Sequence, residues 1–269
     1  MTTTGDSERD LRILRLLWAP PDPPRKGPRP RIGRGQVVAA GLELAASEGL
    51  AALSMRRIAA HLSVGVATIY THVPGREELL ALMFDALVGG SPLPAATGDW
   101  RRNVEAWARE DWELYRAAPW VAQLTASALP GPNLLAWYDA ALATLAGTGL
   151  DSREMVAVVE SVDGYVRGLA REVAAQPPPE RAVAQARAVA SFVDLDRLPA
   201  LRAVALDGAI PGTGDHFEFG LQRLLDGVAA LIAARAAGNL PPGGPPAAIY
   251  DSGPGAQRET RQERPPPGP

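Results

Sequence analysis

Side chains suited to catalysis or metal binding are few in this chain of 269 residues. There is no cysteine, which excludes a disulfide framework, thiol catalysis and Cys-ligated zinc, and there are only three histidines. The chain has no GxSxG or HExxH motif and no phosphate-binding glycine loop. The acids Glu110, Asp111 and Glu113 are typical of a solvated helix face. The sequence therefore predicts no enzyme, no cofactor and no metal site.

Polar and aromatic side chains gather instead in a segment where short helices are predicted. Apolar residues at helical spacing favour a first helix over 33–48, which Gly49 ends. A short second helix over 55–61 follows Ser54, a residue type that caps helices well. All of these elements are short, so their outward side chains lie close together.

A tight turn over 62–65 leads from this second helix to a third, which ends at His72. Val64 is the apolar residue of the turn and can fill the crossing between the two helices. The outer positions of the third helix are largely polar or aromatic. This order of helix, short turn and helix is a helix-turn-helix layout, in which the second of the two presents its residues to the major groove of DNA. Pro74 and Gly75 stop it, and a longer helix covers 76–88.

The remainder of the chain is also predicted to be helical. No alternating apolar and polar run is long enough for a sheet, so we expect an all-α fold. Asp151 or Ser152 is expected to cap a long helix, and Asp215 the last one. The segment 181–206 is weakly patterned and predicts one or two short helices. The other predicted helices cover 100–117, 119–128, 134–145, 151–175 and 215–237.

Four regions follow from these patterns. Residues 1–30 are expected to be a disordered, basic, proline-rich arm, and residues 239–269 a disordered tail rich in proline and glycine. Between them, 31–80 form an N-terminal three-helix DNA-binding domain, and 81–238 form a larger helical domain for ligand binding and dimerisation.

Charge and hydropathy limit where such a protein acts. The net charge is −3, so a nucleic-acid-binding surface has to be local. No apolar run reaches the roughly 18 residues of a membrane-spanning helix, and the run at 11–20 is too short and too charged for a signal peptide. We therefore expect a cytoplasmic protein with no membrane partner.

The segment VVAAGLELAASEGLAALSMRRIAAHLSVGVATIYTHVPGREELLALMFDAL closely resembles the DNA-binding domain of the TetR family of bacterial transcriptional regulators. ALSMRRIAAHL and VGVATIYTHVPGREELL are its most specific parts. Two later segments, GPNLLAWYDAALATLAGTGL and EFGLQRLLDGVAALI, are similar to the C-terminal domain of the tetracycline-repressor-like branch. The resemblance implies a homodimer that binds a palindromic double-stranded DNA operator, most often as a repressor, and that a small-molecule ligand releases.

The resemblance also implies which residues contact DNA. Val66 and Ala67 depart from the more polar residues often found at the start of the recognition helix, and they offer only apolar contact, for instance to thymine methyl groups. Arg56 and Tyr70 could instead be a solvated charge and a half-buried core ring. The expected DNA-contacting residues are Ser54, Arg56, Val66, Ala67, Thr68, Tyr70, Thr71, His72 and Arg76.

Tryptophan is concentrated in the second domain: every tryptophan except Trp18 lies between 100 and 137. Each ring could belong to the core, but together they favour a pocket for a planar, hydrophobic molecule. Asp163 lies in mid-helix among apolar neighbours, so it either pairs with a buried donor or faces a cavity. The expected pocket residues are Trp107, Trp112, Arg116, Trp120, Trp137, Tyr138, Asp163 and Arg167.

Three further expectations concern partners. Tetracycline repressors bind a magnesium–drug chelate through histidine, whereas the ligand domain here has only His216, so we expect a different ligand and no metal. A constitutive DNA-binding protein without a ligand is the alternative, which the tryptophan content disfavours. The dimer interface is expected on the helices at 151–175 and 216–236. The apolar face expected on the first of these comprises Val156, Val159, Val162, Tyr165, Val166 and Leu169.

Overall fold

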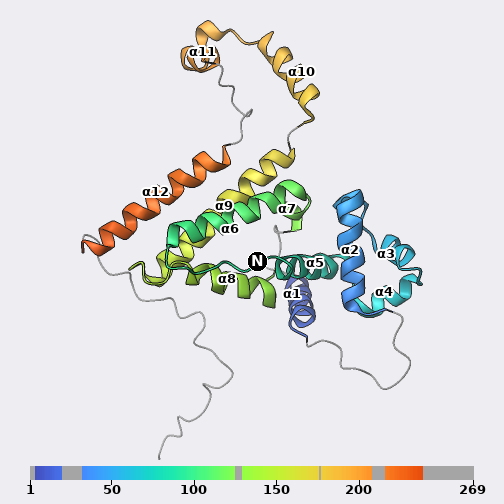
Figure 1. The fold of residues 1–269 in the computed structure, drawn as a ribbon. Helices are drawn as coiled ribbons and strands as arrows, with labels where there is room; N and C mark the ends of the chain where they lie inside the picture. Colours follow the sequence, from blue (N-terminus) through green and yellow to red (C-terminus); the bar gives the residue numbers. More distant parts are fainter. Residues whose placement is uncertain (1–3, 20–31, 125–128, 176, 208–215, 239–269) are drawn as a thin grey trace, which may run out of the picture.

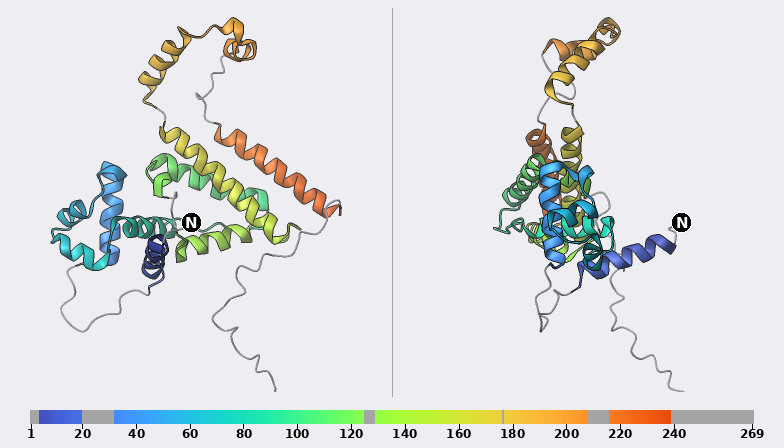
Figure 2. Two further views of the ribbon diagram at one scale, coloured as in Figure 1. Left: turned by 180° about the vertical axis from the view of Figure 1, so that it is seen from behind. Right: turned by 90° about the vertical axis from the view of Figure 1, so that its right-hand side faces the viewer.

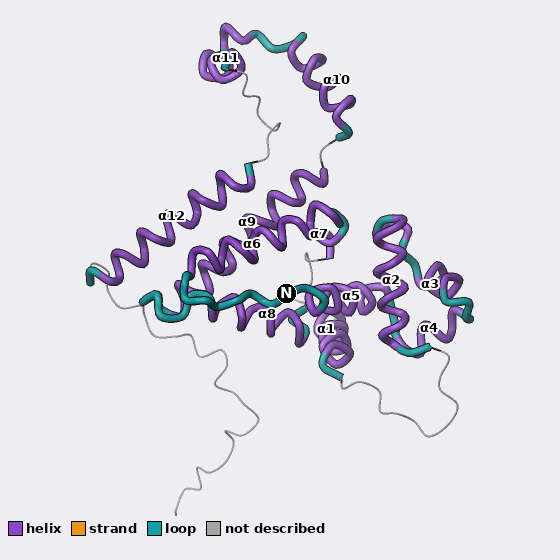
Figure 3. The backbone as a smooth tube through the Cα atoms, in the orientation of Figure 1, coloured by secondary structure: helices purple, strands orange, loops and turns teal. Residues whose placement is uncertain are grey.

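The protein is described from a computed structural model, which covers residues 4–19, 32–124, 129–175, 177–207 and 216–238. Every regular element in these ranges is a helix and none is a strand, which confirms the all-α prediction (Figure 3). Within the same ranges, no helix combines the length and the apolar character that crossing a bilayer requires. A small group of helices lies on one side of α5 and a larger bundle on the other (Figure 1).

The small group follows the predicted boundaries to within a residue. Gly49 ends the first of its helices with a φ of +80°, a conformation that favours glycine. The Ser54 hydroxyl accepts a hydrogen bond of 3.2 Å from the Arg57 backbone N–H, as expected of an N-cap. The elements are α2 (Arg34–Glu48), the 3₁₀ turn η1 (Leu50–Ala52), α3 (Met55–His61), α4 (Val66–His72) and α5 (Arg76–Gly89).

The turn between α3 and α4 is closed by the backbone. Ser63 adopts a left-handed conformation with a φ of +55°. The N–H of Val64 then donates to the Ala59 carbonyl at 2.9 Å, and that of Ser63 to the Ala60 carbonyl at 3.1 Å. This pair of bonds is a Schellman motif, in which the residue after the left-handed one packs back on the helix. Val64 is half-buried against the core, as the sequence predicted.

The N-terminal helix α1 (Thr4–Leu17) corrects the expectation of a disordered arm over 1–30. Its Ile13 and Leu17 are buried, and it packs on α5. Arg12 Nε lies 2.7 Å from the Glu78 carboxylate of α5. The prolines that suggested disorder all lie at position 20 or later, so they leave the preceding apolar residues free to form a helix. Residues 20–30 of the expected arm, and the expected tail at 239–269, lie outside the described residues.

The larger bundle is built around an aromatic core. Trp107 contacts Trp137 edge to face at 5.3 Å between ring centroids, and Trp112 stacks on Phe217 at 4.8 Å. The helices of this part are α6 (Trp100–Ala117), α7 (Val121–Leu124), α8 (Pro132–Ala143), α9 (Ser152–Ala175), α10 (Pro179–Ala190), α11 (Pro199–Leu206) and α12 (Phe217–Ala236).

Three predictions for this bundle concern the N-caps of α9 and α12 and the apolar face of α9. Asp151 caps α9 as predicted, because its carboxylate accepts from the backbone N–H groups of Arg153 and Glu154 at 2.9 Å. The N-cap of α12 is His216, with no side-chain cap bond, and Asp215, the predicted cap, lies outside the described residues. Packing inside the subunit buries half of the apolar face of α9 that was expected at the dimer interface, so that part of the expectation is wrong. The buried residues of that face are Val159, Val162 and Val166.

A hydrogen-bonded joint connects α5 to α8. Asp85 of α5 is buried, and its carboxylate accepts from the backbone N–H groups of Asn133 and Leu134 at 3.1 and 3.2 Å. The Asn133 side chain donates back to the Asp85 carbonyl and carboxylate, each at 3.0 Å. A Cβ at Gly131 would lie 2.2 Å from the Asp85 carboxylate, so only glycine allows this approach. The joint thus caps α8 with a side chain from α5.

The helices α10 and α11 stand away from the bundle (Figures 1 and 2). Neither has a buried residue among those whose side chains the structure describes. Phe192, between them, is 90% exposed. These two helices confirm the expectation of short helices over 181–206.

Candidate nucleic-acid interface and ligand cavity

The outer face of α4 is open to solvent. Ile69 and Val73 are fully buried and fix the helix to the core, which turns the opposite side outward. Tyr70 is 49% exposed and Val66 is 37% exposed. The other exposed residues of this face are Ala67, Thr68 and Thr71, and His72 is half-buried at its end. This arrangement gives α4 a protruding surface of hydroxyl, phenol and imidazole groups.

The start of α3 adds positive charge beside this surface. Arg56 and Arg57 are both exposed. Arg57 forms an ion pair with Glu48 of α2, whereas Arg56 makes no hydrogen bond or ion pair with any residue in the described ranges. Arg56 therefore keeps its guanidinium available for a phosphate or a base edge. Ser54 is committed to its capping role through its hydroxyl.

Arg76 has a structural role that the sequence did not indicate. Its guanidinium donates to the carbonyl oxygens of Leu50 at 3.1 Å and of Leu53 at 3.5 Å. These bonds hold η1 and the residue before Ser54 against the start of α5. Contact of Arg76 with DNA stays a prediction, as does that of every other residue proposed for this surface.

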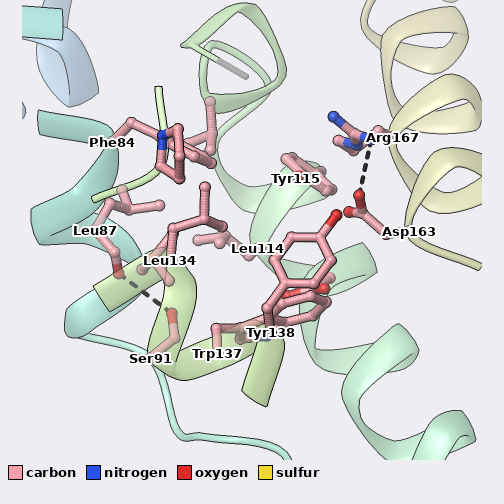
Figure 4. Close-up of a pocket in the computed structure, with 14 residues that line it drawn as sticks. Phe84, Leu87, Ser91, Leu114, Tyr115, Leu134, Trp137, Tyr138, Asp163 and Arg167 are labelled. Carbon is pink, nitrogen blue, oxygen red and sulfur yellow. Dashed lines mark hydrogen bonds and ion pairs between the residues drawn. The ribbon is translucent and has the colours of Figure 1, made fainter. Parts of the chain in front are cut away.

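A cavity of about 290 Å³ lies between the two parts of the molecule (Figure 4). It is close to the lower end of the roughly 300–1,000 Å³ of small-molecule sites. Phe84, Leu87 and Val88 of α5 form one wall, and Asp163 and Arg167 of α9 form another. The remaining lining residues are Ser91, Asp111, Leu114, Tyr115, Val121, Pro130, Leu134, Trp137 and Tyr138.

Half of the predicted pocket residues line this cavity, namely Trp137, Tyr138, Asp163 and Arg167. The other four do not. Trp107 is 2% exposed and belongs to the core, and Trp112 is stacked on Phe217. Trp120 is half-buried between the two hydrophobic cores, and Arg116 is exposed beside Glu113. Sequence spacing could not separate rings that fill the core from rings that face the cavity, because both lie on buried faces.

Asp111 is the lining residue that the sequence interpretation placed wrongly, on a solvated face. It is half-buried in the cavity wall and makes no hydrogen bond or ion pair with any residue in the described part of the chain. Its pKa is raised from 3.8 to about 7, chiefly by burial and then by the charges of Asp163 and Glu110, against the opposing charge of Arg167. Its position four residues after Trp107 on α6 was the signal that could have identified it.

Asp163 and Arg167 form an ion pair of 2.8 Å, one turn apart on α9. Asp163 therefore satisfies both sequence alternatives, since it pairs with a donor and also faces a cavity. Burial raises the pKa of Asp163, and Arg167 opposes the shift. Burial likewise raises the pKa values of Tyr115 and Tyr138, so these phenols stay neutral hydrogen-bonding groups.

Known proteins match both parts of the chain. The family model described as bacterial regulatory proteins, tetR family, matches residues 37–83, and that of the tetracyclin repressor-like C-terminal domain matches residues 92–232. The HTH-type transcriptional repressor DrrR1 of Streptomyces coeruleorubidus is 38% identical over 252 residues, which cover 89% of this chain and 93% of that protein.

Two further relatives link the fold to ligands. The class E tetracycline repressor protein of Escherichia coli is 25% identical over 75% of this chain and 93% of its own length. The structure of the Streptomyces coelicolor TetR family protein ActR in complex with actinorhodin superposes with a TM-score of 0.66 at 26% identity, over 74% of this chain and 96% of that one.

Proposed function

Because the chain belongs to the tetR family of bacterial regulatory proteins, whose relatives here are DNA-binding transcriptional repressors, we propose that it is a ligand-responsive repressor. In this proposal a homodimer binds a palindromic operator, and a planar, hydrophobic molecule in the cavity releases it. The solved complex of ActR with actinorhodin supports a ligand of this kind in the same fold.

The observation that supports DNA binding most directly is the exposure of the α4 face over a fully buried Ile69. Seven residues of helix with one side anchored and the other free fit the major groove, which admits one α-helix. Arg56 beside it supplies a charge with no internal partner in the described chain, so its pairing with DNA breaks no existing ion pair.

The helix α5 supports coupling between the cavity and the DNA-binding surface. Leu79 and Met83 in its first half are fully buried in the core of the small group. Phe84 belongs to that core and also lines the cavity, and Leu87 lines the cavity one turn later. A ligand that shifts Phe84 therefore acts on the core that α5 shares with α2, the helix on which α3 and α4 pack. Since coupling is reciprocal, DNA weakens ligand binding by the same factor as the ligand weakens DNA binding.

A dimer is supported by the outward faces of α9 and α12. Small residues repeat along the exposed side of α9 at Ala157, Ser161, Gly164 and Gly168, and a Cβ at either glycine meets no atom within 4 Å. On α12, Phe219 is 68% exposed on the side opposite the core. Two copies that pack these faces together form a four-helix bundle, which would place two recognition helices about 34 Å apart, one turn of DNA.

Operator binding tests the proposal. The wild-type protein is first used to select its site from a random DNA pool, which should yield a palindrome. Arg56→Ala and Tyr70→Ala should then each weaken binding to that site by about tenfold or more, because each removes a contact worth about 1–3 kcal/mol. Arg102→Ala, which removes an exposed arginine of α6 instead, serves as the charge-matched control.

The loss of operator binding should not come from unfolding of the variants. Circular dichroism should show unchanged helix content in all three variants, so that a loss of binding reflects lost contacts. Normal binding by both Arg56→Ala and Tyr70→Ala would show that this surface is not the DNA interface. Failure of the wild-type protein to select any site would refute the repressor proposal itself.

A further inference from the structure

We propose that the cavity binds a planar aromatic compound that carries a protonated amine, and that Asp111 is the ion-pair partner of this amine. The inference rests on the proposed function and names the chemical class of its ligand. Three features of the cavity support it: an excess of acidic over basic side chains, a carboxylate without an internal partner in the described chain, and aromatic rings among the same lining residues.

The charges that line the cavity do not balance. Asp111, which is ionised above a pH of about 7, and Asp163 are its two carboxylic acids, and Arg167 is the one cationic residue among the lining side chains that the structure describes. Arg167 is engaged by Asp163 at 2.8 Å. One carboxylate, Asp111, is therefore left over, and a positively charged group in the cavity would neutralise it.

The ionised Asp111 side chain lowers the stability of the folded protein unless a partner binds it. A carboxylate removed from water without a hydrogen bond or an ion pair is destabilising, and replacement by a neutral residue would remove that cost. Its raised pKa reports the same cost. An ammonium group at hydrogen-bond distance would favour the ionised carboxylate, so binding of an amine converts an unfavourable group into a charge-assisted contact.

The rest of the cavity suits a flat ring system attached to that amine. Tyr138 and Trp137 of α8 lie on the side of Asp163 and Arg167, whereas Phe84 and Leu87 lie across the cavity from them (Figure 4). The aromatic rings can attract a cation through their faces as well as stack on the ligand. The apolar wall formed by α5 can receive the uncharged end of the same molecule.

An anionic ligand fits these observations less well. Its natural partner is Arg167, whose Nη2 pairs with Asp163 at 2.8 Å and whose Nε is buried without a hydrogen-bond partner, so an anion bound there would place its charge beside that of Asp163. A negative group would also approach Asp111, whose own charge already lies near those of Asp163 and Glu110. A neutral ligand would leave Asp111 unpaired. The cavity therefore discriminates by charge as well as by shape.

Three probes with the same ring system test this charge preference on the full-length protein: 9-(aminomethyl)anthracene, anthracene-9-methanol and anthracene-9-carboxylate. Their affinities are measured by calorimetry at a pH of about 8. The ammonium probe should bind at least about tenfold more tightly than the neutral one, and the carboxylate probe should bind most weakly. Asp111→Asn should bring the ammonium and neutral probes to within about threefold of each other.

The matched control is Glu110→Gln, which removes the same charge from the next position of α6, outside the cavity. It should keep the preference for the ammonium probe. Lowering the pH from about 8 to about 5.5 should reduce that preference in the wild type, since protonated Asp111 attracts no cation, and should have little effect in Asp111→Asn. A cooperative thermal unfolding transition in Asp111→Asn, at a temperature no lower than that of the wild type, shows that the variant is folded.

The possible outcomes separate this inference from the proposed function. Equal or tighter binding of the neutral or anionic probe, a preference that survives Asp111→Asn, or no binding of any probe each overturns the amine ligand. None of these results changes the outcome of the operator experiment with Arg56→Ala, which tests the repressor proposal independently. If the ammonium probe binds through Asp111 but the protein selects no operator, the cavity is an amine site and the repressor proposal fails.

Discussion

Among single residues, Asp111 has an environment that predicts a measurable dependence of stability on pH. Its pKa is about 7 in the folded protein and 3.8 without the fold. A raised pKa means that the folded state binds the proton more tightly, so its stabilising effect is complete below about pH 4 and is lost as the pH rises through about 7. Asp163, Glu110 and Arg167 are the charged groups that act on it.

We therefore expect Asp111→Asn to have the same free energy of unfolding as the wild type near pH 4 and a higher one near pH 8. The full shift corresponds to about 4 kcal/mol, and solvent screening of a half-buried group reduces this to about 1–3 kcal/mol. Urea unfolding at several pH values measures the difference, with Glu113→Gln on the same helix as the exposed control. A difference that stays constant from pH 4 to pH 8 would mean that Asp111 does not titrate as described.

At this scale, the sequence predicted residues whose roles are local. Ser54 and Asp151 cap helices because of groups within three positions, and the left-handed Gly49 follows from its own chemistry. The roles of Asp111 and Arg76 are set by residues far away in the sequence. Asp111 faces a cavity whose other walls come from α5, α8 and α9, and Arg76 donates to a carbonyl of η1. Neighbouring charges such as Glu110 and Glu113 made Asp111 resemble a solvated acid.

Among helices, the contact between α5 and α8 determines how the two parts of the molecule are held. Asp85 is buried in this contact and receives two backbone N–H groups at the start of α8 and the side chain of Asn133. The next residues of α8, Leu134, Trp137 and Tyr138, line the cavity. The joint therefore links the ligand site to α5, which also packs against α2, the helix on which α3 and α4 pack.

Asp85→Ala should lower the free energy of unfolding by about 2–4 kcal/mol, because it removes a helix cap and leaves the backbone N–H groups of Asn133 and Leu134 without their acceptor. Asp139→Ala, on an exposed position of α8, should change it by less than about 0.5 kcal/mol. Urea unfolding of both variants measures the effect. Equal stability of the two variants would show that the joint contributes nothing to holding α8.

Helix boundaries were predicted well where capping residues mark them, and poorly where only tertiary packing decides. The limits of α2, α3 and α4 agree to within a residue. The helix α1 was missed because its stability comes from contact with α5, through Ile13, Leu17 and the pairing of Arg12 with Glu78. An amphipathic segment of 14 residues beside a proline-rich stretch gives little sign of this packing.

For the whole molecule, the prediction of a dimer depends on which faces stay uncovered after each subunit has formed its core. The sequence predicted an interface on α9 and α12, which stays a prediction, but three valines of the face expected on α9 (Val159, Val162 and Val166) are buried within the subunit. The exposed side carries small residues, and the adjacent α12 exposes Phe219 with the Arg223 guanidinium 5.4 Å from its ring centroid. Large exposed aromatic rings are enriched at protein–protein interfaces, so Phe219 marks this side of α12 as the candidate interface.

Phe219→Asp should therefore weaken dimerisation by about tenfold or more, because an aromatic anchor at the centre of an interface contributes about 2 kcal/mol or more. Leu93→Asp, at another exposed apolar position, is the matched control and should remain a dimer. Sedimentation equilibrium measures the mass, which should be twice 28.3 kDa for the wild type and the control.

Operator affinity should fall together with dimerisation in Phe219→Asp, since a monomer offers one recognition helix to a two-part site. A monomeric wild type would refute the dimer. A Phe219→Asp variant that stays fully dimeric at low concentration would show that the interface lies elsewhere. A monomeric variant that still binds the operator at full affinity would show that DNA recognition does not depend on dimerisation.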